Sequence, residues 1–202
     1  MLAATHPGML MAQPAAQTKT ILVVGDSLSA EYGLKRGTGW VALLQQRLDR
    51  EKIAARVVNA SISGDTTAGG RARLAALLRQ HKPDVVVIEL GGNDALRGLP
   101  LQSTEDNLSQ MAGASREAGA RVLLVGMQVP PNYGGDYSRR FAGLFEKVAR
   151  ERQAAVVPFF LKGIADGPDP LRWFQSDRIH PREEAHPKML DNVWPELRKL
   201  LR

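Results

Sequence analysis

A serine that could act as a nucleophile stands directly after an apolar run. Residues 21–24 read ILVV, and Gly25, Asp26 and Ser27 follow. A serine hydroxyl can attack an acyl carbonyl, but it is a weak nucleophile unless a neighbouring base accepts its proton. Asp and Ser are also favoured helix caps, so the same three residues could merely turn the chain. The choice between a nucleophile and a capping serine depends on whether the sequence supplies a base.

The base has few candidates, because the chain has four histidines. His6 stands in the N-terminal stretch, His81 ends a predicted helix just before a strand, and His186 precedes a proline where a helix is expected to start. His180 belongs to SDRIHP, with Asp177 three residues before it. On one turn of chain this spacing lets the carboxylate bind one imidazole nitrogen and leaves the other for a serine.

An acyl-transfer site also needs donors aimed at the oxyanion that forms on the carbonyl. Gly64, in SISGDTT, could offer an unshielded backbone N–H, and Asn93, in LGGND, could offer its side-chain amide. Read singly, both are ordinary loop residues. Asp26 and Asp94 are better explained as carboxylates that shape loops than as acid or base groups.

Other kinds of site find little support in the sequence. The absence of cysteine excludes thiolate catalysis, disulfides and Cys-based zinc. His180, Glu183, Glu184 and His186 lack HExxH spacing, and prolines interrupt their helical face, so we expect no metal. The net charge of +6 comes from scattered residues without interleaved aromatics, so we expect no nucleic-acid partner.

The elements that must position these residues alternate between strands and helices. The patterns predict strands over 20–24, 55–58, 84–90, 120–125 and 154–158, and helices over 40–50, 68–81, 104–118, 137–152 and 187–201. This order indicates an α/β fold in which helices cover both faces of a parallel sheet. Ligands of such sheets bind at the carboxyl ends of the strands. Ser27, Gly64 and Asn93 each follow a strand, and the long connection 159–181 brings His180 to the same edge.

The rest of the composition fits one domain, residues 20–202, behind a short tail. The 202 residues are 44% apolar, which suits one core, and no apolar run approaches the roughly 18 residues of a membrane helix. In residues 1–19 the piece MAQPAAQ is similar to the end of a signal peptide, but a basic start and a long apolar run are missing. We expect a flexible tail and a periplasmic or secreted protein, with a cytoplasmic location left open.

Taken together, four blocks resemble the SGNH-hydrolase superfamily, also called GDSL esterases. They are VVGDSLSAEYGL with Ser27, NASISGDTT with Gly64, IELGGNDALRG with Asn93, and SDRIHP with Asp177 and His180. All four occur in order and extend over most of the chain. The pieces GDSLSAEYGL, GGNDALRG and PPNYG are most similar to the bacterial branch of multifunctional acyl-CoA thioesterase I, lysophospholipase L1 and arylesterase proteins.

This resemblance implies a flavodoxin-like three-layer α/β/α fold with a five-stranded sheet, and a cofactor-free hydrolase of fatty-acid esters and thioesters. It implies a triad of Ser27, Asp177 and His180. It also implies an oxyanion hole made by the N–H groups of Ser27 and Gly64 with the Asn93 side chain. A periplasmic or secreted location fits the same branch, and we expect a monomer that binds a small acyl substrate.

Substrate contacts are expected around this catalytic set. The loop 129–137, VPPNYGGDY, pairs stiff prolines with mobile glycines, so we expect it to cover the site and set chain-length preference, with a passive loop as the alternative. The candidate contact residues are Asp26, Leu28, Asp94, Pro130, Tyr133, Tyr137 and Ile179. After the block SDRIHP the chain reads REEAHP, where relatives commonly carry small or neutral residues, and this leaves the substrate preference and the pH optimum open.

Two other functions stay open at this point. A carbohydrate O-deacetylase of the same fold would need aromatic residues along a sugar groove. Trp40 and Trp194 sit in helical patterns and are expected in the core, which leaves Trp173 as the one tryptophan suited to a groove. A non-catalytic binding module would have no need for the complete set of serine, glycine, asparagine and Asp-x-x-His.

Overall fold

The structure of the chain is a computed structural model that describes residues 18–202. The predicted tail therefore lies outside the described residues except for its last two positions. Lys19, which we expected in that tail, is the first residue of strand β1. Among residues 18–202 there is no helix with the length and apolar character needed to cross a bilayer.

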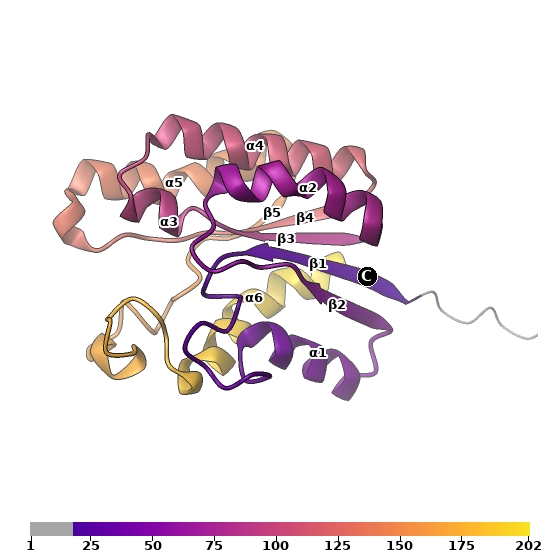
Figure 1. Cartoon of the computed structure of the whole chain (residues 1–202), viewed down its shortest axis with the longest axis horizontal. Helices are drawn as coiled ribbons and strands as arrows, with labels where there is room; N and C mark the ends of the chain where they lie inside the picture. The colour runs from indigo at the N-terminus through magenta and orange to yellow at the C-terminus, as the bar shows by residue number, and fades with distance from the viewer. Residues whose placement is uncertain (1–17) are drawn as a thin grey trace, which may run out of the picture.

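A sheet of five parallel strands forms the centre of the molecule, in the order β2-β1-β3-β4-β5. The strands are β1 Lys19–Gly25, β2 Ala55–Asn59, β3 Val85–Glu89, β4 Arg121–Val125 and β5 Ala155–Val157. The helices are α1 Trp40–Arg50, α2 Thr67–His81, α3 Gly92–Leu96, α4 Leu101–Glu117, α5 Gly135–Arg152 and α6 His186–Leu200. Helices α2 to α5 cover one face of the sheet, and α1 and α6 cover the other (Figure 1). This arrangement confirms the predicted three-layer, flavodoxin-like fold.

The two central strands explain why the sequence pattern was so clear. Residues 21–24 of β1 and 85–88 of β3 are entirely buried, because helices pack on both faces of the sheet. A strand covered on both faces reads as a continuous apolar run rather than as an alternation. These strands form a rigid base, and the residues that follow them are held at one edge.

Two predictions about the segment after β3 were wrong. Residues 91–94, expected as a loop that carries part of the site, include the start of the short helix α3, which begins at Gly92. The next helix begins at Leu101 rather than at Thr104. Thr104 cannot mark the helix start, because its hydroxyl is buried and donates to Asp94 Oδ1 at 3.2 Å. Thr104, a residue type that often caps helices, instead makes a tertiary contact with Asp94 one turn inside α4.

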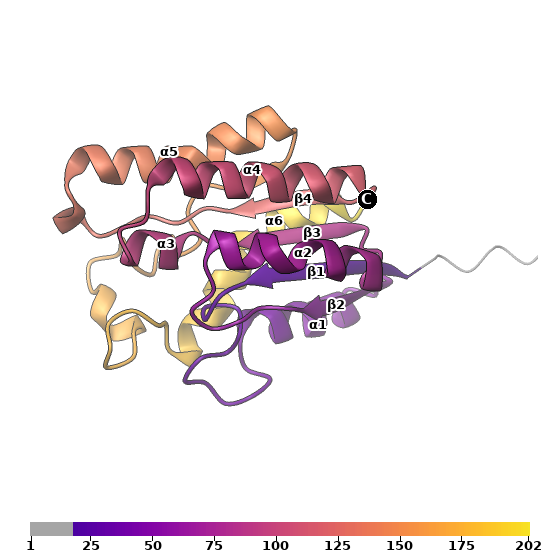
Figure 2. The same ribbon diagram turned by 45° about the horizontal axis from the view of Figure 1, so that its top comes forward.

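The connections that follow the strands gather at one edge of the sheet. The loop after β1, helix α3 and the long connection after β5 all lie at the end toward which the strands point (Figure 2). The long connection contains a short 3-10 helix, Pro170–Trp173. His81 ends α2 at the opposite edge, as expected, so it cannot serve a site beside Ser27.

Candidate active site

The structure brings Ser27, His180 and Asp177 into one hydrogen-bonded line. Ser27 Oγ lies 2.9 Å from His180 Nε2, although the two residues are 153 positions apart in the chain. On the other side of the ring, His180 Nδ1 lies 2.7 Å from Asp177 Oδ2. This is the relation of nucleophile, general base and orienting carboxylate that a serine hydrolase requires.

Asp177 is fixed by the tight turn that it shares with His180. Its Oδ1 accepts the N–H groups of Ile179 at 2.9 Å and His180 at 3.1 Å. Partial burial favours a higher pKa, but hydrogen bonds from the His180 ring and from these two N–H groups outweigh it and lower the pKa of Asp177 to about 2. The carboxylate therefore stays charged at neutral pH, when it has to stabilise an imidazolium.

Two residues that the sequence did not single out hold the histidine in place. The backbone N–H of Gln175 donates to the His180 carbonyl at 2.8 Å, and its side-chain amide donates to the Tyr32 carbonyl at 3.0 Å. The Tyr32 ring packs against the His180 ring, with the ring centres 4.3 Å apart. Gln175 and Tyr32 thus join the histidine loop to the loop that carries Ser27. Tyr32 lies within the block VVGDSLSAEYGL, but no role for it was predicted there.

The turn after β1 shows that Ser27 is not a capping residue. No helix begins in this part of the described chain, and Asp26 rather than Ser27 closes the turn: its Oδ1 accepts the Leu28 N–H at 3.0 Å, and its carbonyl accepts the Ala30 N–H at 2.9 Å. The Ser27 hydroxyl is left to meet His180. The Ser27 N–H makes no hydrogen bond with any other residue in the described part of the chain.

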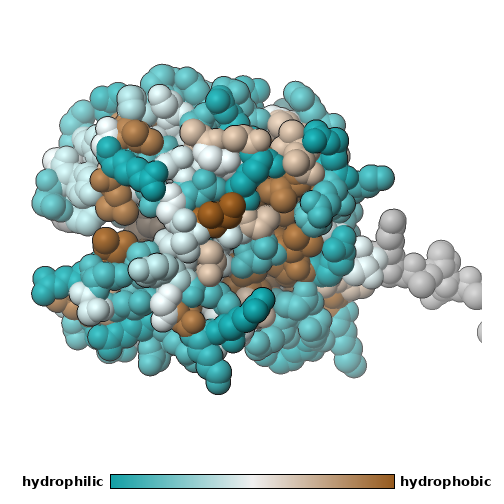
Figure 3. All heavy atoms as spheres, in the orientation of Figure 1, coloured by the Kyte–Doolittle hydropathy of each residue, from teal (hydrophilic) through white to brown (hydrophobic). Residues whose placement is uncertain are grey.

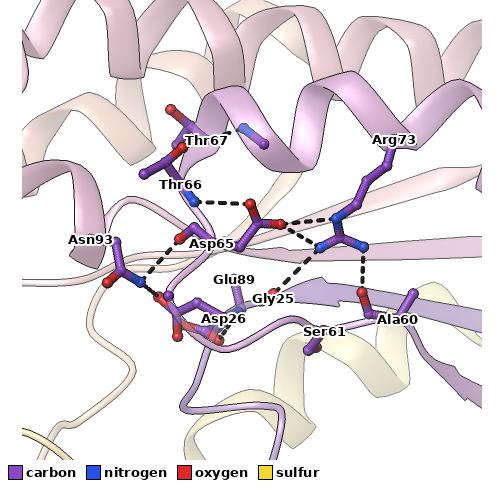
Figure 4. A network of polar contacts seen from close by, with 12 residues as sticks. Gly25, Asp26, Ala60, Ser61, Asp65, Thr66, Thr67, Arg73, Glu89 and Asn93 are labelled. Carbon is purple, nitrogen blue, oxygen red and sulfur yellow. Dashed lines mark hydrogen bonds and ion pairs between the residues drawn. The ribbon is translucent and has the colours of Figure 1, made fainter.

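The other two oxyanion candidates, Gly64 and Asn93, lie beside this turn. They differ in whether their N–H groups already make hydrogen bonds. Gly64 has a φ of +78°, a conformation that favours glycine, and within residues 18–202 its N–H has no hydrogen-bond partner. The Asn93 amide nitrogen, in contrast, donates to Asp26 Oδ2 and to the Asp65 carbonyl, both at 3.0 Å (Figure 4). Both amide hydrogens of Asn93 are therefore engaged, and it must release one to bind an oxyanion.

Comparison with known proteins fits this geometry. Residues 23–187 match the model of the GDSL-like lipase/acylhydrolase family. The chain belongs to this family. It is 53% identical over 193 residues to the esterase TesA of Pseudomonas aeruginosa, covering 96% of this chain and 94% of TesA. A crystal structure of TesA aligns with a TM-score of 0.86, covering 90% of this chain and 99% of that one.

A second relative supports the same branch of the family. The thioesterase 1/protease 1/lysophospholipase L1 of Escherichia coli K12 is 42% identical over 193 residues, covering 96% of this chain and 90% of that protein. The predicted membership in this branch is confirmed. This GDSL hydrolase is an enzyme that acts on ester bonds.

The Asn93→Ala enzyme is expected to lose about 10²–10³-fold in kcat on a p-nitrophenyl ester, or about 3–4 kcal/mol, with KM little changed. The Asn93 amide is the side-chain donor that we expect to bind the negative charge that develops on the carbonyl oxygen. Steady-state kinetics measures the loss, with Gln46→Ala as the control, because Gln46 is an exposed amide on α1. An unchanged kcat would remove Asn93 from the oxyanion hole.

A buried acid lies beneath the nucleophile loop of this GDSL hydrolase. Glu89, at the end of β3, is 2% exposed, and its Oε2 accepts the Ser29 hydroxyl at 2.6 Å. The Ser29 oxygen in turn accepts the Trp40 indole N–H at 3.1 Å. Burial, and then the nearby charge of Asp26, hold the pKa of Glu89 well above its usual range. Burial also raises the pKa of Asp26 to about 6.

These pKa shifts predict that Glu89 and Asp26 contribute less to the stability of this GDSL hydrolase as the pH rises. A carboxyl group whose pKa is raised in the folded state stabilises it fully below the unfolded pKa of 4.5, and this contribution is lost as pH rises through the folded pKa. Glu89→Gln has no proton to lose at this position. Between pH 5 and pH 8 its free energy of unfolding should therefore fall less than that of the wild type. The difference should be about 1.4 kcal/mol for each unit by which folding raises the pKa of Glu89.

Urea unfolding at several pH values tests this prediction. The exposed Glu184→Gln serves as the control, and it should keep the wild-type pH dependence. Parallel curves for wild type and Glu89→Gln would show that Glu89 already ionises freely in the folded protein.

Three of the predicted substrate contacts lie inside the protein and must be corrected. Asp26 and Asp94 are 3% and 1% exposed, and Leu28 is part of the core. Asp94 accepts the backbone N–H of Thr67 at 2.9 Å as well as the Thr67 and Thr104 hydroxyls. It ties α2, α3 and α4 together. These residues shape the loops and offer little or no surface to a substrate.

The remaining contact candidates lie nearer the surface. Pro130 and Ile179 are exposed at the edge that carries Ser27. Tyr133 and Tyr137 are partly buried, with ring centres 6.1 Å apart, and the Tyr137 ring stacks on Phe141. The Tyr137 hydroxyl is buried without a hydrogen-bond partner in the described residues. Tyr137 lies in the first turn of α5, where its ring meets the Tyr133 ring from the preceding loop, and its contact with substrate stays a prediction.

Proposed function

We propose that this GDSL hydrolase cleaves carboxylic esters and thioesters of acyl chains through an acyl-enzyme on Ser27. The observation that carries the proposal is the 2.9 Å contact between Ser27 Oγ and His180 Nε2, backed by Asp177 on the other ring nitrogen. A pair placed in this way can move a proton off the hydroxyl as the hydroxyl attacks.

The reaction then follows from the order of contacts. Ser27 Oγ bonds to the acyl carbon while His180 Nε2 takes the hydroxyl proton, and Asp177 stabilises the resulting imidazolium. His180 gives the proton to the departing alcohol or thiol as that bond breaks. Water then attacks the acyl-enzyme, His180 accepts its proton, and release of the acid restores the Ser27 hydroxyl.

We assign the oxyanion to the N–H groups of Ser27 and Gly64 and to the Asn93 amide. The free N–H groups of the first two residues support this assignment. Donors that are already in place stabilise the developing negative charge without reorganisation. Asn93 requires a small exchange, because one amide hydrogen must pass from Asp26 or from the Asp65 carbonyl to the oxyanion.

The surface around the triad suits acyl substrates. The large hydrophobic side chains that are exposed in the described residues lie in segments that follow strands, and these residues are Tyr32, Ile62, Leu96, Leu171 and Ile179. Figure 3 shows apolar atoms above and below a notch at this edge of the molecule. The names of the relatives add acyl thioesters and lysophospholipids to the substrates that we propose.

A matched substrate panel tests the proposed substrates. We expect turnover of p-nitrophenyl esters from acetate to palmitate, of an acyl-CoA and of a lysophospholipid, together with covalent labelling of Ser27 by a fluorophosphonate. Labelling without turnover of any of these acyl substrates would contradict the proposed substrate class. Absence of both would contradict the mechanism.

We further propose that the protein is a periplasmic or secreted monomer. All of the groups assigned to catalysis come from one chain, which supports a monomer, and the MAQPAAQ piece supports export. Light scattering of the purified protein and fractionation of the producing cells test the two statements separately. A carbohydrate O-deacetylase is not favoured, because the Arg172 guanidinium lies over the Trp173 ring at 4.3 Å and covers one of its faces.

A further inference from the structure

One arginine joins two backbone segments beside the proposed oxyanion hole, the end of β1 and the connection between β2 and α2. Arg73 lies on α2, and its side chain is 20% exposed. Its Nε and Nη2 lie 2.9 and 2.8 Å from Asp65 Oδ2. Nη1 donates to the carbonyl of Ala60, just after β2, and Nη2 lies 3.5 Å from the carbonyl of Gly25, at the end of β1 (Figure 4).

The partners of Arg73 lead directly to the oxyanion donors. Asp65 follows Gly64, and the Asp65 carbonyl accepts the Asn93 amide at 3.0 Å. Gly25 is two residues before Ser27, at the point where β1 ends. One guanidinium therefore contacts the segments that carry Ser27 and Gly64, and Asp65 extends this link to the Asn93 amide. Arginine suits this task, because its planar fork of five N–H groups can bind several acceptors in a fixed geometry.

The ion pair is also placed where it can hold a loop. The Asp65 side chain is 11% exposed, so water competes with the pair less than it does at the surface. Asp65 Oδ1 also accepts the Thr66 N–H at 3.1 Å, which leaves the carboxylate little freedom to turn. Gly64 has no side chain to fix its own position, and its peptide follows the residues on either side.

We infer that Arg73 is a positioning residue of the oxyanion hole, which holds the Gly64 loop and the Asn93 amide at a fixed distance from Ser27. This inference rests on the proposed function and its oxyanion hole. Arg73 touches neither the nucleophile nor the base, so it acts through Asp65 and the backbone. A displacement of about 1 Å at a catalytic group can cost about 10²-fold in rate.

Kinetics of Arg73→Met and Arg73→Lys test the inference. We expect Arg73→Met to lower kcat by about 10–100-fold with KM within about twofold, because the donors act on the transition state. Arg73→Lys keeps the charge but not the fork and should fall between Arg73→Met and wild type. Arg71→Met is the matched control, because Arg71 lies on the same helix, is exposed and donates to Gln110. It should keep wild-type kinetics.

A double mutant separates positioning from simple destabilisation. If Arg73 acts through the oxyanion hole, Arg73→Met should cost less than about threefold in an Asn93→Ala background, because that hole is already impaired. If the loss of kcat in the double variant equals the product of the losses in the two single variants, the inference is wrong. A lower melting temperature with unchanged kcat of the folded enzyme would also overturn it.

The conservative variant Asp65→Asn keeps the test valid if Arg73→Met does not fold. It removes the ion pair while it retains the shape of the side chain and the Asp65 carbonyl. We expect the same loss of kcat at constant KM, and an unchanged kcat would overturn the inference. If Asn93→Ala itself has no effect, the oxyanion assignment fails. If Asn93→Ala impairs catalysis and the Arg73 and Asp65 variants do not, only the positioning role fails.

Discussion

The Ser27→Ala enzyme is expected to lose about 10⁶-fold in kcat on a p-nitrophenyl ester. The methyl group cannot form the acyl-enzyme, and His180 is left with no hydroxyl to deprotonate. What remains is the modest catalysis that the oxyanion donors and substrate binding give to direct attack by water. Single-turnover and steady-state assays with purified protein measure the loss.

The control for this large effect is Ser103→Ala, because Ser103 is an exposed serine on α4 and should leave the rate unchanged. Fluorophosphonate labelling followed by mass spectrometry gives an independent readout, since wild type should carry one adduct and Ser27→Ala none. A Ser27→Ala enzyme within about tenfold of wild type would overturn the nucleophile assignment and the proposed mechanism with it.

The Asp177→Asn enzyme is expected to lose about 10⁴-fold in kcat, with KM close to that of wild type. The asparagine can point its amide N–H at His180 Nδ1, and the ring then carries its proton on Nε2, where it cannot accept the Ser27 proton. The variant also removes the charge that the N–H groups of Ile179 and His180 now stabilise. Both effects fall on the chemical step and not on substrate binding.

Asp169→Asn is the matched control for this variant. Asp169 is an exposed carboxylate in the same connection after β5, and its side chain makes no cap hydrogen bond to the 3-10 helix that follows it. It should keep the wild-type rate. If Asp177→Asn retained a tenth of the wild-type kcat, His180 would need another orienting group, and the assignment of Asp177 would be wrong.

The sequence predicted those parts of the protein that depend on local pattern. The run DVVVIEL marked a buried strand, and the spacing of Asp177 and His180 placed a carboxylate beside an imidazole within one turn. The proximity of Ser27 to Asp177 and His180 could be predicted only from the fold, because parallel strands bring their carboxyl ends to one edge of the sheet. The family resemblance then supplied the order of the four blocks.

The parts that were missed depend on partners far away in the chain. Glu89 looked like the polar end of an apolar strand, and its partner Ser29 is 60 residues away. Thr104 looked like a helix cap because the contact that it makes with Asp94 cannot be seen in a local window. Arg73 looked like one of several scattered surface arginines on α2. No periodicity marks a side chain whose role is to join separate loops.

The long sequence distance between nucleophile and base has a consequence for how activity appears during folding. Ser27 meets His180 across 153 positions, and the backbone N–H of Trp40 donates to His186 Nδ1 across 146, so the start of α1 is tied to the start of α6. Closing loops of this length is entropically costly, and such contacts are slow to form. A nascent chain that has not yet reached His180 carries a nucleophile without a base. Esterase activity that returns on refolding therefore reports the completion of the whole domain and not the formation of any one of its elements.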